Sequence, residues 1–371
     1  MNFDIDQDAF PSAVHSLIYF TARGIIPLEQ SLADIEDSDM RASCTAFHGF
    51  VMAMLADMYD NPVEYHLPVM LLEDFCKGRK INGLKQKYPS KAKNVIARTR
   101  NAVNNYIELL YRLGTHGETS GETLVFSSEA LDKYDKTLKG SVRSICVADM
   151  FKAMARVGIT VRENEVTSKE YPTMFPALCA LSRLARTNSG FDFFAFRTLD
   201  FRNLNGRHKP AYEDYFRPLT EKQKKQAYAL QDFAASRKMK PTISTFWKVD
   251  YKYKGSQVMC IGSEWNLGEM ALDIRVMGTY HWDDPALIND RLAQESPDFQ
   301  KNILRHILRC TACSTTHLGM FVTVLGKKQR VCGGGAIAFR WKNPDDEDMA
   351  VIKRVIELRC GIIDEQKKGG N

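Results

Sequence analysis

The chain has 371 residues, 44% of them hydrophobic and 26% charged, which is ordinary for a soluble globular protein and long enough for two or three domains. Its most apolar stretch, FHGFVMAMLADMY at residues 47–59, is too short to span a bilayer and carries His48 and Asp57, so no membrane partner is expected. The acidic amino terminus lacks the pattern of a secretory signal, and six of the nine cysteines stand alone, which favours a cytoplasmic protein over a disulfide-bonded one.

The net charge of +6 is unevenly distributed along the chain. Residues 1–50 hold eight acids and two bases, whereas residues 77–100 hold nine bases and residues 301–342 hold eight, both without an acid. Such segregation is typical of surfaces that bind phosphate, although the bases could also form solvated faces that pack against the acidic amino terminus. The candidate polyanion-binding residues are Lys91, Lys93, Arg98 and Arg100 in the first basic segment and Lys327, Lys328 and Arg330 in the second.

The first part of the chain is expected to be a helical domain over residues 1–115. One helix is predicted from Ser38 to Asp60, because the pair Asn61-Pro62 stops it. A second helix is predicted to begin at Ser90 and to end at Gly114. The small, polar residues 114–123 are expected to form a linker or an exposed loop.

The middle of the chain is expected to be an α+β domain over residues 124–300. Helices are predicted around residues 174–186 and 220–236. The pattern then changes, because apolar and polar residues alternate over residues 247–253, Lys254-Gly255 follows as a turn, and two more strand-like runs come after it. Three consecutive antiparallel strands with one wet face form a small meander.

The tail, residues 301–371, holds a cluster of cysteines in the segment RCTACSTTHLGMFVTVLGKKQRVCGGG. Cys310 and Cys313 form a C-x2-C knuckle, which supplies two zinc ligands from one tight turn. The alternating segment after it is expected to be a hairpin that turns at Gly326-Lys327 and returns the chain to Cys332. The sequence therefore predicts a zinc-ribbon-like module with three cysteine ligands.

The fourth zinc ligand stays open at this point. His317 gives the spacing C-x2-C-x3-H-x14-C and is the first choice, whereas His306 and Cys360 are the alternatives. With His317 bound, the site is closed and structural; without it, one position is open to water, as in catalytic zinc sites. A decayed ribbon without metal, or thiols that are only buried, would explain the same residues.

A well-marked helix follows the hairpin, with Asn343 as its expected cap, Pro344 in its first turn and four acids at residues 345–348 that match the positive helix end. This carboxyl-terminal order resembles a group of uncharacterised bacterial proteins, in which a C-x2-C knuckle is followed by a GKK-x3-CG hairpin and an NP-x2-ED helix. The resemblance implies a helical and α+β body with a zinc-ribbon-like tail, and it implies no activity. The matching residues are Cys310, Cys313, Gly326 to Lys328, Cys332, Gly333, Asn343, Pro344, Glu347, Asp348, Ile352, Lys353 and residues 356–359, with similar segments at 249–255 and 171–178.

Two classes of function fit these observations. The first is a non-enzymatic, zinc-containing binding or regulatory protein whose basic surfaces contact nucleic acid or another polyanion. The second is a small-molecule sensor or enzyme with a pocket between the helical part and the meander and a purely structural ribbon. The sequence contains no phosphate-binding glycine loop and no G-x-S-x-G motif, and it identifies no catalytic residue.

Overall fold

The structure is a computed structural model, and it describes residues 10–70, 89–141, 145–187, 191–206, 211–244, 248–266, 269–277, 285–307, 320–331 and 337–369. Within these ranges the fold is α+β, as the sequence predicts, with a helical amino-terminal part, antiparallel sheets and a long carboxyl-terminal helix. No helix in the described ranges is both long enough and apolar enough to cross a membrane.

Two compact units make up the chain. The first consists of Met1–Pro218 with the short segment Trp265–Met270, and the second consists of Leu219–Glu264 with Ala271–Asn371. Each of the two boundaries expected from the sequence, near residues 120 and 300, lies inside one of these units. The division into three domains stays a prediction.

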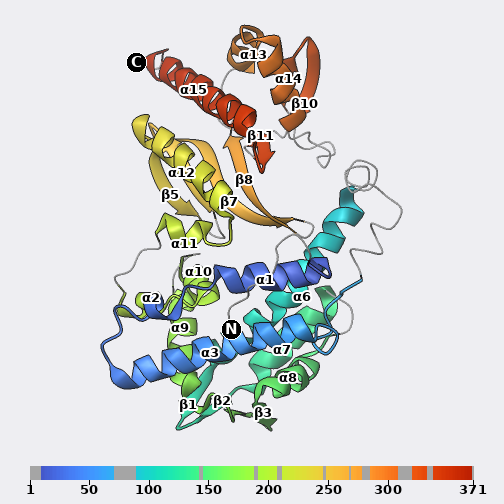
Figure 1. The fold of residues 1–371 in the computed structure, drawn as a ribbon, viewed down its shortest axis with the longest axis vertical. Helices are drawn as coiled ribbons and strands as arrows, with labels where there is room; N and C mark the ends of the chain where they lie inside the picture. Colours follow the sequence, from blue (N-terminus) through green and yellow to red (C-terminus); the bar gives the residue numbers. More distant parts are fainter. Residues whose placement is uncertain are drawn as a thin grey trace. The chain divides into compact units, whose positions relative to one another are not determined.

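The first unit is mainly helical, with one small sheet (Figure 1). The four strands of the sheet are antiparallel and lie in the order β1-β2-β4-β3. The helices are α1 Ala13–Gly24, α2 Leu28–Ser31, α3 Ser38–Asp60, α6 Pro89–His116, α7 Ser128–Ser141, α8 Val147–Met154, α9 Phe175–Thr187, α10 Phe191–Thr198 and α11 Tyr212–Phe216, with short 3-10 turns at Ala155–Val157, Pro172–Met174 and Phe201–Asn205. The strands are β1 Gly117–Ser120, β2 Thr123–Phe126, β3 Ile159–Arg162 and β4 Glu165–Ser168.

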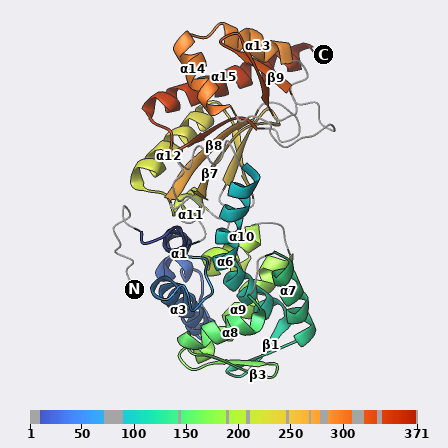
Figure 2. The same ribbon diagram turned by 90° about the vertical axis from the view of Figure 1, so that its right-hand side faces the viewer.

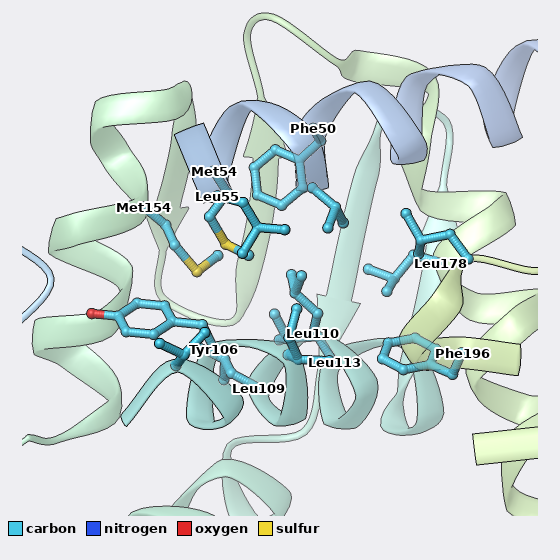
Figure 3. Packing of buried hydrophobic residues seen from close by; sticks show 14 of the residues in the cluster. Phe50, Met54, Leu55, Tyr106, Leu109, Leu110, Leu113, Met154, Leu178 and Phe196 are labelled. Atoms are coloured by element: carbon cyan, nitrogen blue, oxygen red, sulfur yellow. The ribbon is translucent and has the colours of Figure 1, made fainter. Parts of the chain in front are cut away.

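Helices α3 and α6 face each other across the apolar core of this unit. In Figure 3, Phe50 and Met54 point from α3 toward Leu110 and Tyr106 of α6, and all four side chains are buried. Burial of one such side chain contributes about 1.5–3 kcal/mol to folding. The predicted bounds of α3 are confirmed, and Asp37 begins the helix by accepting a hydrogen bond from the backbone N–H of Met40 at 2.7 Å.

The sequence predicts that helix α6 ends at Gly114, and this prediction is wrong. The helix continues to His116, and Gly114 lies where α6 passes close to α9. A Cβ at this position would lie 2.2 Å from the Ser182 hydroxyl oxygen and 2.6 Å from the Leu178 carbonyl oxygen. The glycine is therefore explained by close helix packing, and a C-terminal stop is not needed.

The expected loop at residues 114–123 is also wrong. Strands β1 and β2 pair from Gly117 opposite Phe126 to Ser120 opposite Thr123, and Gly121, with φ of 60°, occupies the turn. Three of the four residues of β1 are exposed, so its sequence does not need the alternation of apolar and polar residues that marks a half-buried strand. Backbone pairing alone makes it a strand.

Within the described residues, the second unit combines a five-stranded sheet with four helices and a separate hairpin (Figures 1 and 2). Helix α12 lies across the sheet, and α13, α14, α15 and the hairpin lie together beside it. The helices are α12 Glu221–Ser236, α13 Pro285–Ala293, α14 Pro297–His306 and α15 Asp346–Gly369. The strands are β5 Lys240–Ser244, β6 Lys248–Tyr253, β7 Ser256–Asn266, β8 Glu269–Met277, β9 Met320–Val324, β10 Lys327–Val331 and β11 Ile337–Lys342, although residues 265–270 belong to the first unit.

The predicted meander is confirmed as strands β6, β7 and β8. The full sheet has the order β11-β8-β7-β6-β5, so one strand from the middle of the chain and one from the tail extend the meander at its two edges. Strand β11 is antiparallel to β8, with Trp341 opposite Ile274. Residues of the tail thus complete the sheet that the middle of the chain begins.

Charged residues on this sheet form a cluster around one buried carboxylate. Asp273 is only 1% exposed and accepts hydrogen bonds from the Nε atoms of Arg275 and Arg340, both at 2.6 Å. Burial alone would raise the pKa of the Asp273 carboxyl, but the hydrogen bonds and charges of the two arginines hold it below its ordinary value. Glu264 contacts both arginines and lies 3.9 Å from the Lys342 ammonium group.

Helix α15 begins later than the sequence predicts. Asn343 is not its cap, because Asn343 has φ of 49° and its side-chain oxygen accepts a hydrogen bond from the backbone N–H of Leu272 at 2.9 Å. Asp345 begins the helix instead, since its carboxylate accepts from the N–H of Asp348 at 2.8 Å and its own N–H donates to the Asp348 carboxylate at 3.4 Å. The acids of this first turn therefore stabilise the helix end, as expected.

Candidate functional site

The four predicted zinc ligands, Cys310, Cys313, His317 and Cys332, lie outside the described residues. The hairpin that joins their two segments is present, and Met320 pairs with Val331 at its open end. Both segments therefore leave the hairpin at the same end. The turn itself is Leu325-Gly326, one residue earlier than predicted, because Val324 pairs with Lys327.

Of the two alternative fourth ligands, His306 has other partners in the structure and Cys360 is buried. His306 places its Nε2 atom 3.1 Å from an Asp348 carboxylate oxygen, and its ring stacks on Trp341 with 5.2 Å between the ring centres. Cys360 lies buried in α15, and burial raises the pKa of its thiol to about 12, which disfavours the thiolate that zinc requires. Among the described residues, no group of three or more His, Cys, Asp or Glu side chains is arranged to hold a metal ion.

The hairpin formed by β9 and β10 has one apolar face and one face that combines an aromatic ring with positive charge. Val322, Val324 and Val331 are fully buried, and β9 packs on α13. On the other face, Phe321 is 44% exposed and pairs directly with Arg330. Isolated two-stranded hairpins are marginally stable in water, so the buried valines are needed to hold this one.

Lys328 and Phe321 contact each other on the exposed face of the hairpin. The Lys328 ammonium nitrogen lies 4.6 Å from the centre of the Phe321 ring, a distance at which a cation is attracted to the ring. Lys327 is also exposed, but it pairs with Val324 and so lies at the turn, off this face. Of the three predicted basic residues of the hairpin, the structure therefore brings Lys328 and Arg330 together beside Phe321.

Side chains from α13 and α14 fix the backbone of β9. The Asn289 side chain accepts a hydrogen bond from the N–H of Thr323 at 2.7 Å and donates one to the carbonyl of Phe321 at 3.4 Å. Gln300 accepts from the N–H of Leu325 at 2.8 Å. These contacts satisfy backbone groups of β9 and of the turn that follows it, so Phe321 is presented from a fixed strand.

The predicted basic residues near position 95 belong to helix α6 of the first unit. Arg98 is exposed and Arg100 is half-buried. Lys91 and Lys93 also lie within α6, but their side chains are outside the description. A polyanion surface on α6 stays a prediction.

A second basic region, which we call the basic hollow, was not found from the sequence. It has a volume of about 980 Å³ and lies where the carboxyl-terminal ends of α12 and α15 meet β5 and the turn between β6 and β7. None of the described residues that line it is a carboxylate, and its uncharged lining residues are Ser236, Thr242, Tyr253 and Gly255. The six cations that line it are Arg237, Lys238, Lys240, Lys252, Lys254 and Lys367.

Two of the six cations have acidic partners on α15. The Lys254 ammonium group lies 2.6 Å from Asp364, and this hydrogen bond raises the pKa of Lys254, whereas Arg237 forms an ion pair with Glu357. Lys367 donates a hydrogen bond to the carbonyl of Lys254. For Lys238, Lys240 and Lys252, the described part of the chain offers no hydrogen bond or ion pair to the side chain, so three cations stay available to a ligand.

Comparisons of the chain with protein-family models, with curated proteins and with solved structures find no match. The resemblance of the tail to a group of bacterial proteins therefore stays a prediction.

Proposed function

We propose that the protein is a non-enzymatic, cytoplasmic binding protein that holds single-stranded nucleic acid on the exposed face of the β9–β10 hairpin. The observation that carries this proposal is the exposed ring of Phe321 between Lys328 and Arg330. An aromatic ring offers a stacking surface to any base, and the flanking cations attract the phosphates next to that base. A base in a duplex is already stacked and cannot reach the ring, so a single strand is favoured.

The charge of the hairpin supports a polyanionic partner. Residues 320–331 hold three bases and no acid. Each phosphate that these bases neutralise releases a counterion, so binding should weaken as salt rises. A ligand that bound only to the exposed phenylalanine would not need charged groups near the ring. Because Lys328 and Arg330 lie on the same face of the hairpin as this ring, a charged ligand is favoured.

Zinc fastens the hairpin in this proposal. Cys310, Cys313, Cys332 and His317 would hold it, and the common exit of their two segments from the open end of the hairpin supports this ligand set. Metal analysis of protein purified without chelator should find about one zinc per chain, and less after Cys332→Ser. Absence of zinc from the unaltered protein would contradict the proposal.

The binding proposal is tested with Phe321→Ala and a fluorescent single-stranded oligonucleotide at low salt. We expect about tenfold weaker binding, since stacking on one aromatic ring contributes about 1–3 kcal/mol. Replacement of Lys328 and Arg330 by alanine should weaken binding and reduce the slope of log affinity against log salt by about 1.4, or about 0.7 for each lost phosphate contact. Duplex DNA of the same length should bind more weakly and should respond little to Phe321→Ala.

Two control variants match these changes. Val63→Ala removes an apolar side chain that is 71% exposed in the first unit, and it should leave oligonucleotide binding unchanged. Lys222→Ala with Lys225→Ala removes two exposed bases from α12, as many as the paired hairpin variant does. Equal effects of the hairpin and control variants, or no binding by the unaltered protein at low salt, would reject the proposal.

A further inference from the structure

We propose that the basic hollow is a second binding site, which takes a compact anion with about three phosphate groups. This inference does not depend on the hairpin or on zinc. It depends on the convergence of charge in the hollow, on two lysines that face each other across β5 and β6, and on two lysines in left-handed backbone positions. The last two features are unfavourable for folding without a ligand.

The charge of the hollow comes from elements that are far apart in the sequence. Its six cations lie just after α12, on β5, on β6, in the turn after β6, and on α15. Glu357 and Asp364 neutralise two of them, so among the described residues an excess of four positive charges remains. Like charges repel one another when the fold brings them together, and a bound anion removes this repulsion.

The clearest unfavourable feature is the register of β5 and β6. Lys240 lies directly opposite Lys252, and both side chains are exposed. Like charges directly opposite each other destabilise an antiparallel pair. The next pair on the same side of the strands, Thr242 opposite Asp250, has no such conflict. An acid at position 240 or 252 would stabilise the sheet, so the two lysines are better explained by a ligand.

Two lysines of the hollow also occupy left-handed backbone positions. Lys238 has φ of 57° and follows α12, where the N–H of Lys238 donates to Ala235 at 2.9 Å and the N–H of Met239 donates to Ala234 at 3.0 Å. This is the helix ending in which glycine is strongly preferred at the position of Lys238.

Lys254 has φ of 47° and Gly255 has φ of 86°. A two-residue hairpin turn with both φ values positive favours asparagine, aspartate or glycine at the position of Lys254. A lysine at either site strains the backbone, and both side chains line the basic hollow.

Helix dipoles explain only part of this charge. Arg237 and Lys367 stand at the carboxyl-terminal ends of α12 and α15, where cations are stabilising. The dipoles do not explain why Lys240 faces Lys252, because β5 and β6 carry no helix end. The cations without an acidic partner therefore point to a ligand.

The size of the hollow and the grouping of its lysines favour a compact ligand. A volume of about 980 Å³ is at the upper end of small-molecule sites, which span roughly 300–1,000 Å³. Three lysines without an acidic partner match three phosphate groups held close together. A nucleic-acid strand spaces its charges along an axis and would require a row of cations along a groove.

The first test uses inorganic triphosphate as the probe and isothermal titration calorimetry on the full chain at constant ionic strength. Lys240→Ala with Lys252→Ala should weaken binding at least tenfold, because charge-assisted hydrogen bonds are the strong ones. The matched control, Lys222→Ala with Lys225→Ala, removes two exposed lysines from the same unit and should leave the affinity unchanged. No binding by the unaltered protein, or equal loss in both double variants, would overturn the proposal.

The second test reads stability and binding in the same proteins. Lys238→Gly and Lys254→Gly should each raise the melting temperature without ligand by about 2–4 °C, because glycine relieves the strain, and each should weaken triphosphate binding. Leu325→Gly is the matched control, since Leu325 has φ of 50° in the other two-residue hairpin turn of this unit. It should raise the melting temperature and leave triphosphate binding unchanged.

The assignment to a small anion would be overturned in two ways. In one, the two glycine variants keep full affinity for triphosphate. In the other, a single-stranded oligonucleotide displaces triphosphate from the Phe321→Ala protein, which would assign the hollow to nucleic acid.

Discussion

Two of the charge clusters among the described residues, one in each unit, are built in opposite ways. In the first unit, Arg202 donates to Asp200 at 2.7 and 3.1 Å and to Asp214 at 3.0 Å, and all three residues are buried. In the second unit, the lysines of the basic hollow are exposed, and three of them have no acidic partner among the described residues. A charged side chain that folding removes from water needs an oppositely charged partner. A charged side chain that stays in water needs none and can bind a ligand.

The buried cluster also shows what complete pairing does to the backbone around it. Asp214 accepts from Arg202, from Arg217 at 3.3 Å and from the N–H of Ala211 at 2.9 Å. One carboxylate thus fixes the start of α11 relative to the 3-10 turn that holds Arg202. Among the described residues, Lys238, Lys240 and Lys252 of the hollow have no such partner, so these lysines can reorient around an incoming anion.

The largest effect is expected from Arg202→Ala. This change leaves Asp200 and Asp214 buried without their shared partner, and we expect a loss of about 3–5 kcal/mol in the free energy of unfolding. Urea denaturation measures it. The control Arg162→Ala makes the same chemical change at an exposed position and should cost less than about 0.5 kcal/mol. Similar small losses in both variants would break the contrast between the paired and unpaired regions.

Gly114→Ala extends the contrast to the backbone. In the first unit a glycine stands where a Cβ would lie 2.2 Å from the Ser182 hydroxyl, whereas in the hollow lysines stand where glycine would be favourable. We expect a loss of about 1–3 kcal/mol from overpacking between α6 and α9. Adding Ser182→Ala should recover part of this loss, because it removes the closest atom. Full stability of the single variant in thermal unfolding would show that the helices can separate without cost.

A smaller effect is expected from the partly exposed pair of Asp57 and Arg156. Burial alone would raise the pKa of Asp57, but hydrogen bonds from Arg156, at 2.7 and 3.1 Å, and from Tyr65 keep it below its ordinary value. A carboxyl whose pKa is lowered by folding stabilises the fold above its unfolded pKa of about 3.9, and this contribution disappears as pH falls through the lower, folded value.

Arg156→Ala should therefore cost about 1 kcal/mol at pH 7 and progressively less below pH 4. The free energy of unfolding, measured in urea from pH 7 to pH 3, checks this sign. Lys133→Ala, at an exposed pair with Glu129, is the control and should change stability little at any pH. A cost of Arg156→Ala that grows on acidification would contradict the assigned direction.

The sequence predicts the elements whose signals are local. Helix α3 has its predicted bounds, since the Asn61-Pro62 pair marks its end in the sequence, and the turn at Lys254-Gly255 follows from the alternation on both sides of it. The role of Gly114 was predicted wrongly, because the sequence alone does not distinguish a glycine that permits close packing of α9 from a glycine that ends a helix.

The candidate sites were predicted only in part for the same reason. Lys328 and Arg330 were chosen from a local run of charge, but their relation to Phe321 depends on the hairpin register, which a one-residue shift of the turn changes. The basic hollow joins residues more than 100 positions apart, such as Lys252 and Lys367. In the sequence alone, its lysines are indistinguishable from solvent-exposed residues of a strand or of a helix end. Only the fold shows that they lie close together.

Strand β5 has a further consequence as the last strand in the sheet order. Its outer backbone edge would ordinarily be a template for a strand from another molecule, and such pairing leads to aggregation. Pro241 has no N–H to donate to such a strand. Lys240 places a positive charge at this edge, which would be repelled by the Lys240 of a second copy. The residues that line the hollow at this edge should therefore also oppose self-association, so that concentrated protein remains free of cross-strand fibres.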